Sequence, residues 1–266
     1  MIHRGKRDIL GVGISVVDYE GAAAQVIEAA QARLPLAVSA LAVHGVMTGA
    51  LDPEHRYRLN RFGLVVPDGQ PVRWALRWLH GEVLPDRVTG PQLTVEIFRR
   101  AEELGLSIFL FGSHADVLDA MRARLTLEFP TLRIAGAEPS AFRQLSESEN
   151  RALDDRIRAS GADIVLVGLG CPRQEVFAYE HAEALARPTI AVGAAYDYYA
   201  GRLSRAPRWV QSAGLEWVVR LLQEPRRLWK RYLLLNPLYL TLLARQKLGL
   251  LHPEAERAPS QELRYG

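Results

Sequence analysis

The feature that most constrains this chain is the alternation of short apolar runs with longer stretches of helical periodicity. The runs predict strands and the stretches between them predict helices. The expected strands are 9–17, 36–43, 63–66, 107–112, 133–136, 163–168 and 189–192. The expected helices include 21–32, 92–104, 115–129, 146–160 and 174–186, and Ser146 followed by Glu149 predicts a capping box. This order is typical of a mostly parallel sheet with helices on both faces.

The pattern changes after Gly201, where the sheet-forming part is expected to end. Residues 208–223 are helical in pattern, Glu224-Pro225 begins another helix, and Asn236-Pro237 is expected to break it. Between positions 202 and 247 there are ten Lys or Arg residues and two acids, a charge of +8; the whole chain carries +3, so the remainder carries −5. We therefore expect an α/β, Rossmann-like domain over 1–205, a basic helical appendage over 206–251, and a disordered tail over 252–266.

Four basic residues gather on one side of the helix that follows Pro225. At about 100° per residue, Arg226, Arg227, Lys230 and Arg231 fall within an arc of about 140°, and Trp, Tyr and Leu cover most of the rest. Such a helix is typical of a surface that lies on anionic lipid; the alternative is the solvated face of an ordinary packed helix. Polar residues, Pro and Gly interrupt the apolar segment 34–51, and the apolar segment 232–244 is short. We expect neither segment to span a bilayer.

The cysteine content and the N-terminal sequence indicate the cellular compartment of the protein. The single cysteine, Cys171, excludes a disulfide framework and fits a reducing environment, and the seven histidines lack zinc-binding spacing. Three basic residues before the run 9–17 are similar to the start of a signal peptide, but Asp8 interrupts the junction and acidic residues follow the run. We therefore expect a first strand there and a cytoplasmic protein.

Two strand ends carry the strongest candidates for chemistry, because ligands of open α/β sheets bind at the carboxyl ends of strands. The strand 63–66 runs into Pro67-Asp68-Gly69, where Asp68 is a candidate general base; the alternative is a plain turn. The strand 163–168 runs into Gly168-Leu169-Gly170-Cys171-Pro172-Arg173-Gln174-Glu175. Glycines before the start of a helix favour phosphate binding. Arg173 stands where a dinucleotide-binding fingerprint has its third glycine, so that fingerprint fails and a nucleoside diphosphate site is the alternative that the segment still allows.

Other residues near strand ends complete the candidate set. Gly112 ends the strand 107–112, and Gly193-Ala194-Ala195-Tyr196-Asp197 follows the strand 189–192. Arg87 is a candidate phosphate ligand, with an ion pair to Asp86 or Glu82 as the alternative. Cys171 is expected to be a packing residue rather than a nucleophile. Asp-x-Asp does not occur in the sequence, which predicts no bridging divalent metal and leaves arginines and helix dipoles to stabilise a leaving group.

Together these segments resemble the WecG/TagA/CpsF glycosyltransferases, bacterial enzymes of surface polysaccharide and teichoic-acid assembly. The resemblance runs from about Gly11 to Leu250 and rests on many short motifs in the same order. They are Val66-Pro67-Asp68-Gly69, Asp86-Arg87-Val88-Thr89-Gly90, Gly168 to Glu175, Gly193 to Asp197 with Ala200-Gly201, Arg205-Ala206-Pro207, Gly214-Leu215-Glu216-Trp217 with Arg220, and Glu224-Pro225-Arg226-Arg227 with Arg231-Tyr232.

The resemblance implies an inverting, metal-independent and cofactor-free transfer of a sugar from a UDP-sugar to a saccharide carried on polyprenyl diphosphate. It implies that Asp68 is the base and that Gln174 lies near the reaction centre. It also implies that the appendage closes the site while docking on the inner face of the cell membrane. Nucleic acid is not an expected partner, and a homo-oligomer is compatible with the sequence. The substrate-binding candidates are Arg87, Gly112, Gly168, Gly170, Arg173, Gly193, Tyr196, Asp197, Arg205, Arg220 and Arg227, of which Arg87, Arg220 and Arg227 are implied to handle the diphosphates.

One departure from the family concerns the donor sugar. The family usually has Thr-x-Asn after its early strand, and those positions fall here near Ala40 and Ala42, which cannot make the same hydrogen bonds. N-acetylmannosamine is therefore not implied, and a uronic acid or plain hexose fits equally. Two other classes stay as alternatives: an NAD-dependent or other nucleotide-sugar-modifying enzyme, against which the missing third glycine counts, and a basic nucleic-acid-binding module, against which the acidic remainder counts.

Overall fold

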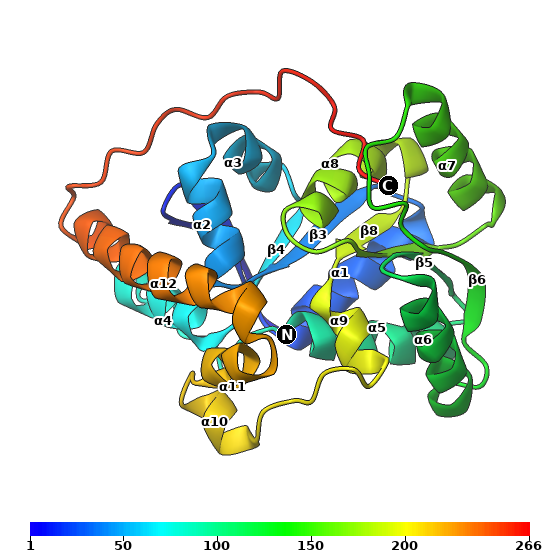
Figure 1. Cartoon of the computed structure of the whole chain (residues 1–266), viewed down its shortest axis with the longest axis horizontal. Coiled ribbons are helices and arrows are strands. Elements are labelled where there is room, and N and C mark those ends of the chain that lie inside the picture. The colour runs from blue at the N-terminus through cyan, green and yellow to red at the C-terminus, as the bar shows by residue number, and fades with distance from the viewer.

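The computed structural model describes residues 1–266 except for the side chains of Arg208, Arg227 and Arg231. Its centre is a sheet in which six strands of the described chain run parallel, in the order β4-β3-β8-β7-β5-β6 (Figure 1). These strands are β3 (Leu36–Leu41), β4 (Leu64–Pro67), β5 (Ser107–Gly112), β6 (Arg133–Glu138), β7 (Ile164–Gly168) and β8 (Pro188–Ala191). The predicted α/β fold with a parallel, Rossmann-like sheet is confirmed.

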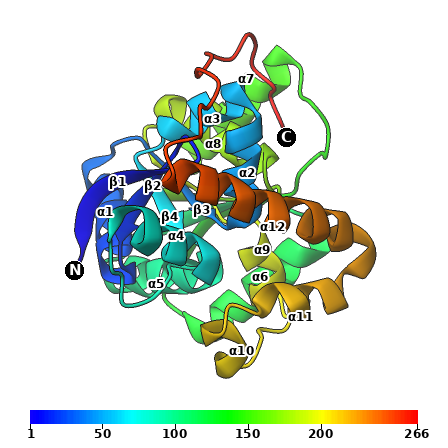
Figure 2. The same ribbon diagram turned by 90° about the vertical axis from the view of Figure 1, so that its left-hand side faces the viewer.

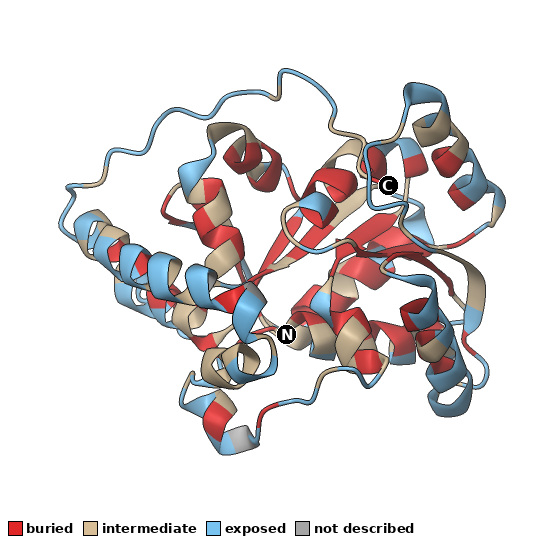
Figure 3. Cartoon of the chain, viewed as in Figure 1, coloured by how far each residue is buried: buried red, intermediate tan, exposed pale blue. Residues whose placement is uncertain are grey.

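Helices cover both faces of this sheet, because successive strand side chains point to opposite faces and both sets are apolar. On one face, residues such as Val38, Leu110 and Ile190 pack against the helices α1 (Tyr19–Ala32), α5 (Gly90–Glu103), α6 (Ala115–Glu128) and α9 (Ala194–Tyr199). The other face packs against α2 (Val43–Leu51), α3 (Pro53–Asn60), α4 (Gln70–His80), α7 (Glu147–Ala159), α8 (Arg173–Leu185) and α12 (Pro225–Lys247). Buried residues follow the sheet and the inward helix faces (Figure 3).

The predicted first strand, 9–17, is wrong as a single element. The chain instead forms an antiparallel hairpin of β1 (His3–Ile9) and β2 (Val12–Val17), which pair outside the parallel sheet. Leu10 and Gly11 turn the chain with φ values of 56° and 86°. Two left-handed residues give the tight turn that matches the twist of paired strands. Leu10 is apolar and buried, so its pattern is that of a strand residue although it occupies the turn.

The predicted helices are confirmed within about two residues at most ends. The capping box at the start of α7 is also confirmed: the Glu149 N–H donates to Ser146 Oγ at 3.3 Å, and the Ser146 N–H donates to Glu149 Oε2 at 2.8 Å. This reciprocal pair satisfies two amide groups that the first helical turn leaves unpaired.

The basic segment forms α10 (Arg208–Ser212), α11 (Glu216–Gln223) and α12. The predicted break at Asn236-Pro237 is wrong, since α12 continues through Pro237. Proline removes one backbone hydrogen bond, but packing holds both halves of the helix: Leu228 is buried before the proline, and Tyr239 and Leu243 are buried after it. Of the helices in the described part of the chain, none is both long enough and apolar enough to cross a membrane.

Residues 252–266 run past α3 and α8 towards the carboxyl edge of the sheet, whereas their polar composition predicts a frayed tail (Figure 1). The amides of Leu263 and Arg264 donate to the Glu180 carboxylate at 2.7 and 3.0 Å. Gln144 and Tyr265 form an isolated antiparallel bridge. Hydrogen bonds of the backbone therefore hold this segment in place, and amino-acid composition does not reveal such bonds.

Candidate active site

Asp68 lies at the carboxyl end of β4, where the chain turns into α4. The Asp68 N–H donates to the carbonyl of Leu41 at the end of the neighbouring strand β3, at 3.1 Å. Its Oδ2 accepts the N–H of Gly90, the first residue of α5, at 3.3 Å. The residue as a whole is half-buried. A strand end and a helix start together fix the orientation of this side chain.

Burial raises the pKa of Asp68 to about 6, because a charged carboxylate loses hydration there. The Gly90 hydrogen bond favours the charged form and lowers the pKa. Among nearby charges, Glu216 raises it, and Arg87 and Arg220 lower it. A carboxylate with a pKa near 6 is mostly ionised at neutral pH and is a stronger base than an ordinary aspartate.

Arg87 joins the catalytic sheet to the appendage. Its guanidinium is buried and donates to the Gln211 carbonyl at 2.9 Å and to the Gln211 Oε1 at 3.0 Å. It also forms an ion pair with Glu216 of α11, with a nitrogen–oxygen distance of 2.8 Å. The two residues that the sequence offered as its partners, Asp86 and Glu82, are not the ones that hold the guanidinium. Arg87 therefore fixes α10 and α11 beside Asp68.

The glycine turn after β7 is braced by Gln174. The Gln174 Oε1 accepts the Gly170 N–H at 3.0 Å, and its Nε2 donates to Glu175 Oε1 at 2.9 Å. A Cβ atom at Gly193 would lie 2.3 Å from Gln174 Oε1, so the loop after β8 can approach only because that residue is glycine. Gln174 is buried with both ends of its amide bonded to the protein. It positions the two loops around the turn.

Gly112 and Gly168 lie where the direction of the chain connections reverses. From β5 the chain continues to β6 on one side, and from β7 it continues to β8 on the other. Helices α6 and α8 accordingly cover opposite faces. Gly112 and Gly168 are register partners at the ends of β5 and β7, and a Cβ atom at Gly112 would lie 3.1 Å from the Gly168 carbonyl carbon, so the two strand ends lie close together. Such a switch point is the usual ligand crevice of an open α/β sheet.

The Asp68 end and the glycine turn share one edge of the sheet. Three strand spacings separate β4 from β7 in the sheet order, which at about 4.8 Å per spacing corresponds to roughly 14 Å. A nucleoside diphosphate sugar can extend over such a distance. A cavity of about 330 Å³ lies nearer the β6 edge of the sheet, between Phe111, Glu138 and Leu153, and neither Asp68 nor the glycine turn lines it.

The structure separates the remaining candidates into buried and accessible residues. Tyr196 is fully buried in the core, where its ring lies against Gly168 and its hydroxyl donates to the Leu166 carbonyl at 2.8 Å. Arg173 is exposed at the start of α8, with its guanidinium 5.5 Å from the Tyr265 ring centroid. Asp197 is half-buried on α9.

Two arginines of the C-terminal region lie near Asp68 and Glu216. Arg205 is exposed and donates to Gln92 Oε1 at 3.0 Å, and its charge lowers the pKa of Glu216, which burial otherwise raises. Arg220 donates to Glu224 Oε2 at 2.8 Å, and its guanidinium lies 5.3 Å from the Tyr198 ring centroid. The side chain of the third candidate, Arg227, lies outside the described residues.

The alanine that departs from the family pattern lies within this site. A Cβ atom at Gly90 would be 3.3 Å from the Ala40 Cβ and 3.8 Å from Asp68 Oδ2. Ala40 therefore lies beside the amide that binds the Asp68 carboxylate, and it offers no hydrogen-bonding group there. Ala42 is exposed at the start of α2.

Two site residues were missed by sequence reasoning. Glu216 and Gln211 belong to the basic segment, and both bind Arg87. The available signal was that Glu216 is one of only two acids between positions 202 and 247. An isolated acid in a basic segment indicates a specific cationic partner, but it does not indicate which one.

The comparison with known families agrees with this arrangement. The model of the Glycosyl transferase WecG/TagA/CpsF family matches residues 7–253, which is most of the chain. The matched region includes Asp68, the glycine turn and the whole appendage. The family acts in the synthesis of cell-surface polysaccharides. This chain therefore belongs to the WecG/TagA/CpsF family of glycosyltransferases.

Proposed function

We propose that this glycosyltransferase moves a sugar from a UDP-sugar to a saccharide carried on polyprenyl diphosphate, with inversion at the anomeric carbon. An acceptor hydroxyl oxygen attacks that carbon and forms the new glycosidic bond. The bond to the β-phosphate oxygen breaks, and UDP leaves with the electron pair. Asp68 takes the hydroxyl proton.

The observation that carries this proposal is the setting of Asp68. Its carboxylate is held by the Gly90 amide at the edge where ligands of such sheets bind, and the residue as a whole is half-buried. Burial raises its pKa to about 6, which makes the carboxylate a stronger proton acceptor while most of it is still ionised at neutral pH.

Positive groups near Asp68 support stabilisation of the departing diphosphate by protein charge. Arg87 and Arg220 are both close enough to lower the pKa of Asp68. The turn at Gly170 precedes the start of α8, where backbone amides favour an anion. In this proposal, arginines and the helix start balance the negative charge that develops on UDP, and a divalent metal is not required.

The appendage supports a lipid-borne acceptor. Its helix α12 contains no acidic residue, and its outward side chains include Trp229, Leu233 and Leu234, which are all exposed. We place this face against the inner leaflet, with the catalytic domain (1–205) in the cytoplasm. The Arg87–Glu216 pair then links the membrane-facing part (206–251) to the base.

The direct experiment is a panel of UDP-sugars assayed with a polyprenyl-diphosphate saccharide, with and without EDTA. General-base assistance contributes ~100- to 10,000-fold, so Asp68→Asn is expected to lower turnover by about that factor. Asp155→Asn, an exposed aspartate on α7, is the matched control and is expected to retain turnover. Full activity of Asp68→Asn would remove this residue from the reaction. Loss of turnover in EDTA that Mg²⁺ restores would overturn the metal-independent part.

A further inference from the structure

Helix α4 exposes two tryptophans of the catalytic domain. Trp74 and Trp78 are 47% and 49% exposed, although large aromatic side chains are usually well buried. They lie four residues apart and therefore share one face of the helix. The opposite face is buried through Val72 and Leu76. Packing thus accounts for one side of α4 and leaves about half of each tryptophan side chain exposed.

Helix α12 lies alongside α4 (Figure 2). The Tyr239 hydroxyl donates to the Pro71 carbonyl at 3.3 Å, and Lys247 Nζ donates to the Trp78 carbonyl at 2.7 Å. Tyr239 and Leu243 belong to the same apolar cluster as Val72. The two helices therefore form one joint surface.

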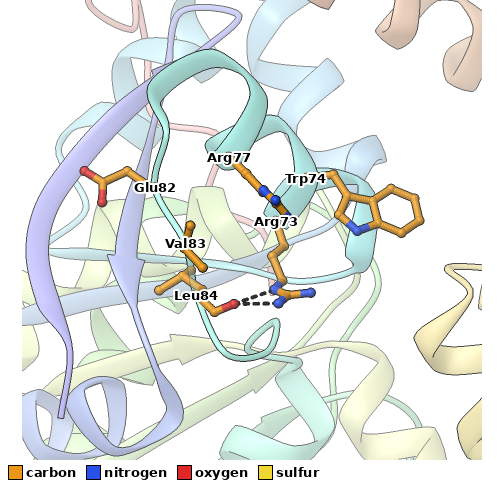
Figure 4. A pocket seen from close by; sticks show the side chains of 6 residues that line it. All are labelled: Arg73, Trp74, Arg77, Glu82, Val83 and Leu84. Atoms are coloured by element: carbon orange, nitrogen blue, oxygen red, sulfur yellow. Dashed lines mark hydrogen bonds between the residues drawn. The ribbon is translucent and has the colours of Figure 1, made fainter.

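The charged residues in the sequences of α4 and α12 are all basic. Neither 70–80 nor 225–247 contains an Asp or Glu residue, whereas together they contain eight Lys or Arg residues. One of the eight, Arg73, is turned inward and donates to the Leu84 carbonyl, while Trp74 projects away from it (Figure 4). Arg77 is exposed between the two tryptophans. Exposed tryptophans with basic residues and no acids complement an anionic phospholipid surface.

We propose that Trp74 and Trp78 are a second membrane-contact element, which anchors the catalytic domain itself on anionic phospholipid beside α12. The proposal rests on the lipid-borne acceptor of the proposed function. Its consequence is geometric. Asp68 lies two residues before Gln70, the first residue of α4, and Trp74 lies four residues after Gln70, about 6 Å along the helix axis at 1.5 Å per residue. The anchor therefore holds the base close to the surface that presents the acceptor.

The test measures binding of the full chain to vesicles of phosphatidylglycerol and phosphatidylcholine by sedimentation. Trp78→Ser is the cleaner variant, because the Trp74 ring also packs closely on Gly214 and its loss can disturb the appendage. Trp78→Ser removes the exposed half of one tryptophan side chain from the membrane interface, and it is expected to weaken vesicle binding about tenfold. Leu127→Ser on α6, which is 83% exposed and far from α4 in the fold, is the matched control and is expected to bind as the unmodified chain does.

A second measurement tests contact directly. Lipids brominated in the acyl chain are expected to quench the tryptophan fluorescence of the unmodified chain more than that of Trp74→Phe/Trp78→Phe. Turnover on a short-chain, water-soluble acceptor is expected to be unchanged in Trp78→Ser, whereas turnover on a vesicle-borne acceptor is expected to fall.

The outcomes separate this proposal from the one on which it rests. If the unmodified chain does not bind phosphatidylglycerol vesicles, the membrane part of the proposed function fails, and this proposal fails with it. If the unmodified chain binds but Trp78→Ser binds equally and quenching is unchanged, only the role of α4 is overturned. A change of oligomeric mass in Trp78→Ser without a change in vesicle binding would assign this face to contact between copies, and would equally overturn it.

Discussion

The substitution Asp68→Asn is expected to stabilise the protein while it abolishes most of the activity. Folding raises the pKa of Asp68 from 3.8 to about 6, so the folded state binds the proton more tightly than the unfolded state. The stability linked to this proton is fully present below pH 3.8 and is lost as the pH rises through about 6. Above that pH, a raised pKa of about two units corresponds to roughly 3 kcal/mol of destabilisation. Asparagine has no charge to desolvate and can still accept the Gly90 hydrogen bond.

The assay is urea unfolding of both proteins at two pH values. Integration of the linkage gives a gain for Asp68→Asn of about 3 kcal/mol at pH 8 and about 1 kcal/mol at pH 4.5. A gain that is equal at both pH values, or a loss at pH 8, would refute the reasoning.

Asp18→Asn is the control of opposite sign. Burial raises the pKa of Asp18, but hydrogen bonds from the Ile2 and Gly21 amides outweigh it, so its pKa is lowered. Asp18→Asn is therefore expected to lose stability by nearly the same amount at pH 8 and at pH 4.5, because both values lie above the unfolded pKa of 3.8.

Three further predictions follow from the same contacts. If Asp68 is the base, kcat/KM should fall about tenfold from pH 7 to pH 5, since its ionised fraction falls by that factor about a pKa near 6; a pH profile that is flat over this range would contradict it. Glu216→Gln removes a negative charge that raises the pKa of Asp68, and it also releases Arg87, so the acid limb of the kcat/KM profile should move to lower pH. Glu82→Gln is the control: it removes an ion pair at the hairpin and should leave that limb in place. Ser146→Ala should lower the free energy of unfolding by about 1 kcal/mol, measured in urea, and an unchanged value would mean that the capping box contributes nothing.

Much of the sheet was predictable because each buried strand carries its own signal. The runs that became β3, β4, β5, β7 and β8 are short, apolar and bounded by turn residues, so their local pattern needs no tertiary context. The hairpin was not predictable in the same way. Leu10 occupies the turn as an apolar, buried residue, and only its left-handed backbone distinguishes it from a strand residue.

The behaviour of α12 illustrates a different limit. A proline within a helical pattern predicts a break, because it removes a hydrogen bond and crowds the preceding turn. Here packing of Leu228, Tyr239 and Leu243 on both sides of Pro237 holds the helix together. The local propensity of a residue is a prior that burial elsewhere in the same element can override.

Some features of the candidate site were likewise predictable from the sequence, and others were not. Asp68 and the glycine turn could be placed at one sheet edge from the sequence, because the carboxyl ends of parallel strands share an edge. The roles of Gln174 and Tyr196 could not be predicted. Gln174 braces the turn just before it against the loop at Gly193, and Tyr196 packs on the end of β7, so both roles depend on how separate strand ends come together. The partners of Arg87 depend on the path of the appendage.

The sequence by itself determined that this chain forms a parallel α/β sheet, that a carboxylate follows one strand and a glycine turn follows another, and that positive charge is concentrated in the last helices. These properties are local, since periodicity, turn chemistry and charge are each written within a few neighbouring residues. Only the tertiary structure decided that Glu216 of the appendage meets Arg87 beside Asp68, and that the tryptophan-bearing helix α4 lies beside the C-terminal half of α12, where Lys247 donates to the Trp78 carbonyl. Such contacts join residues more than a hundred positions apart, and only the packing of the whole chain brings those residues together.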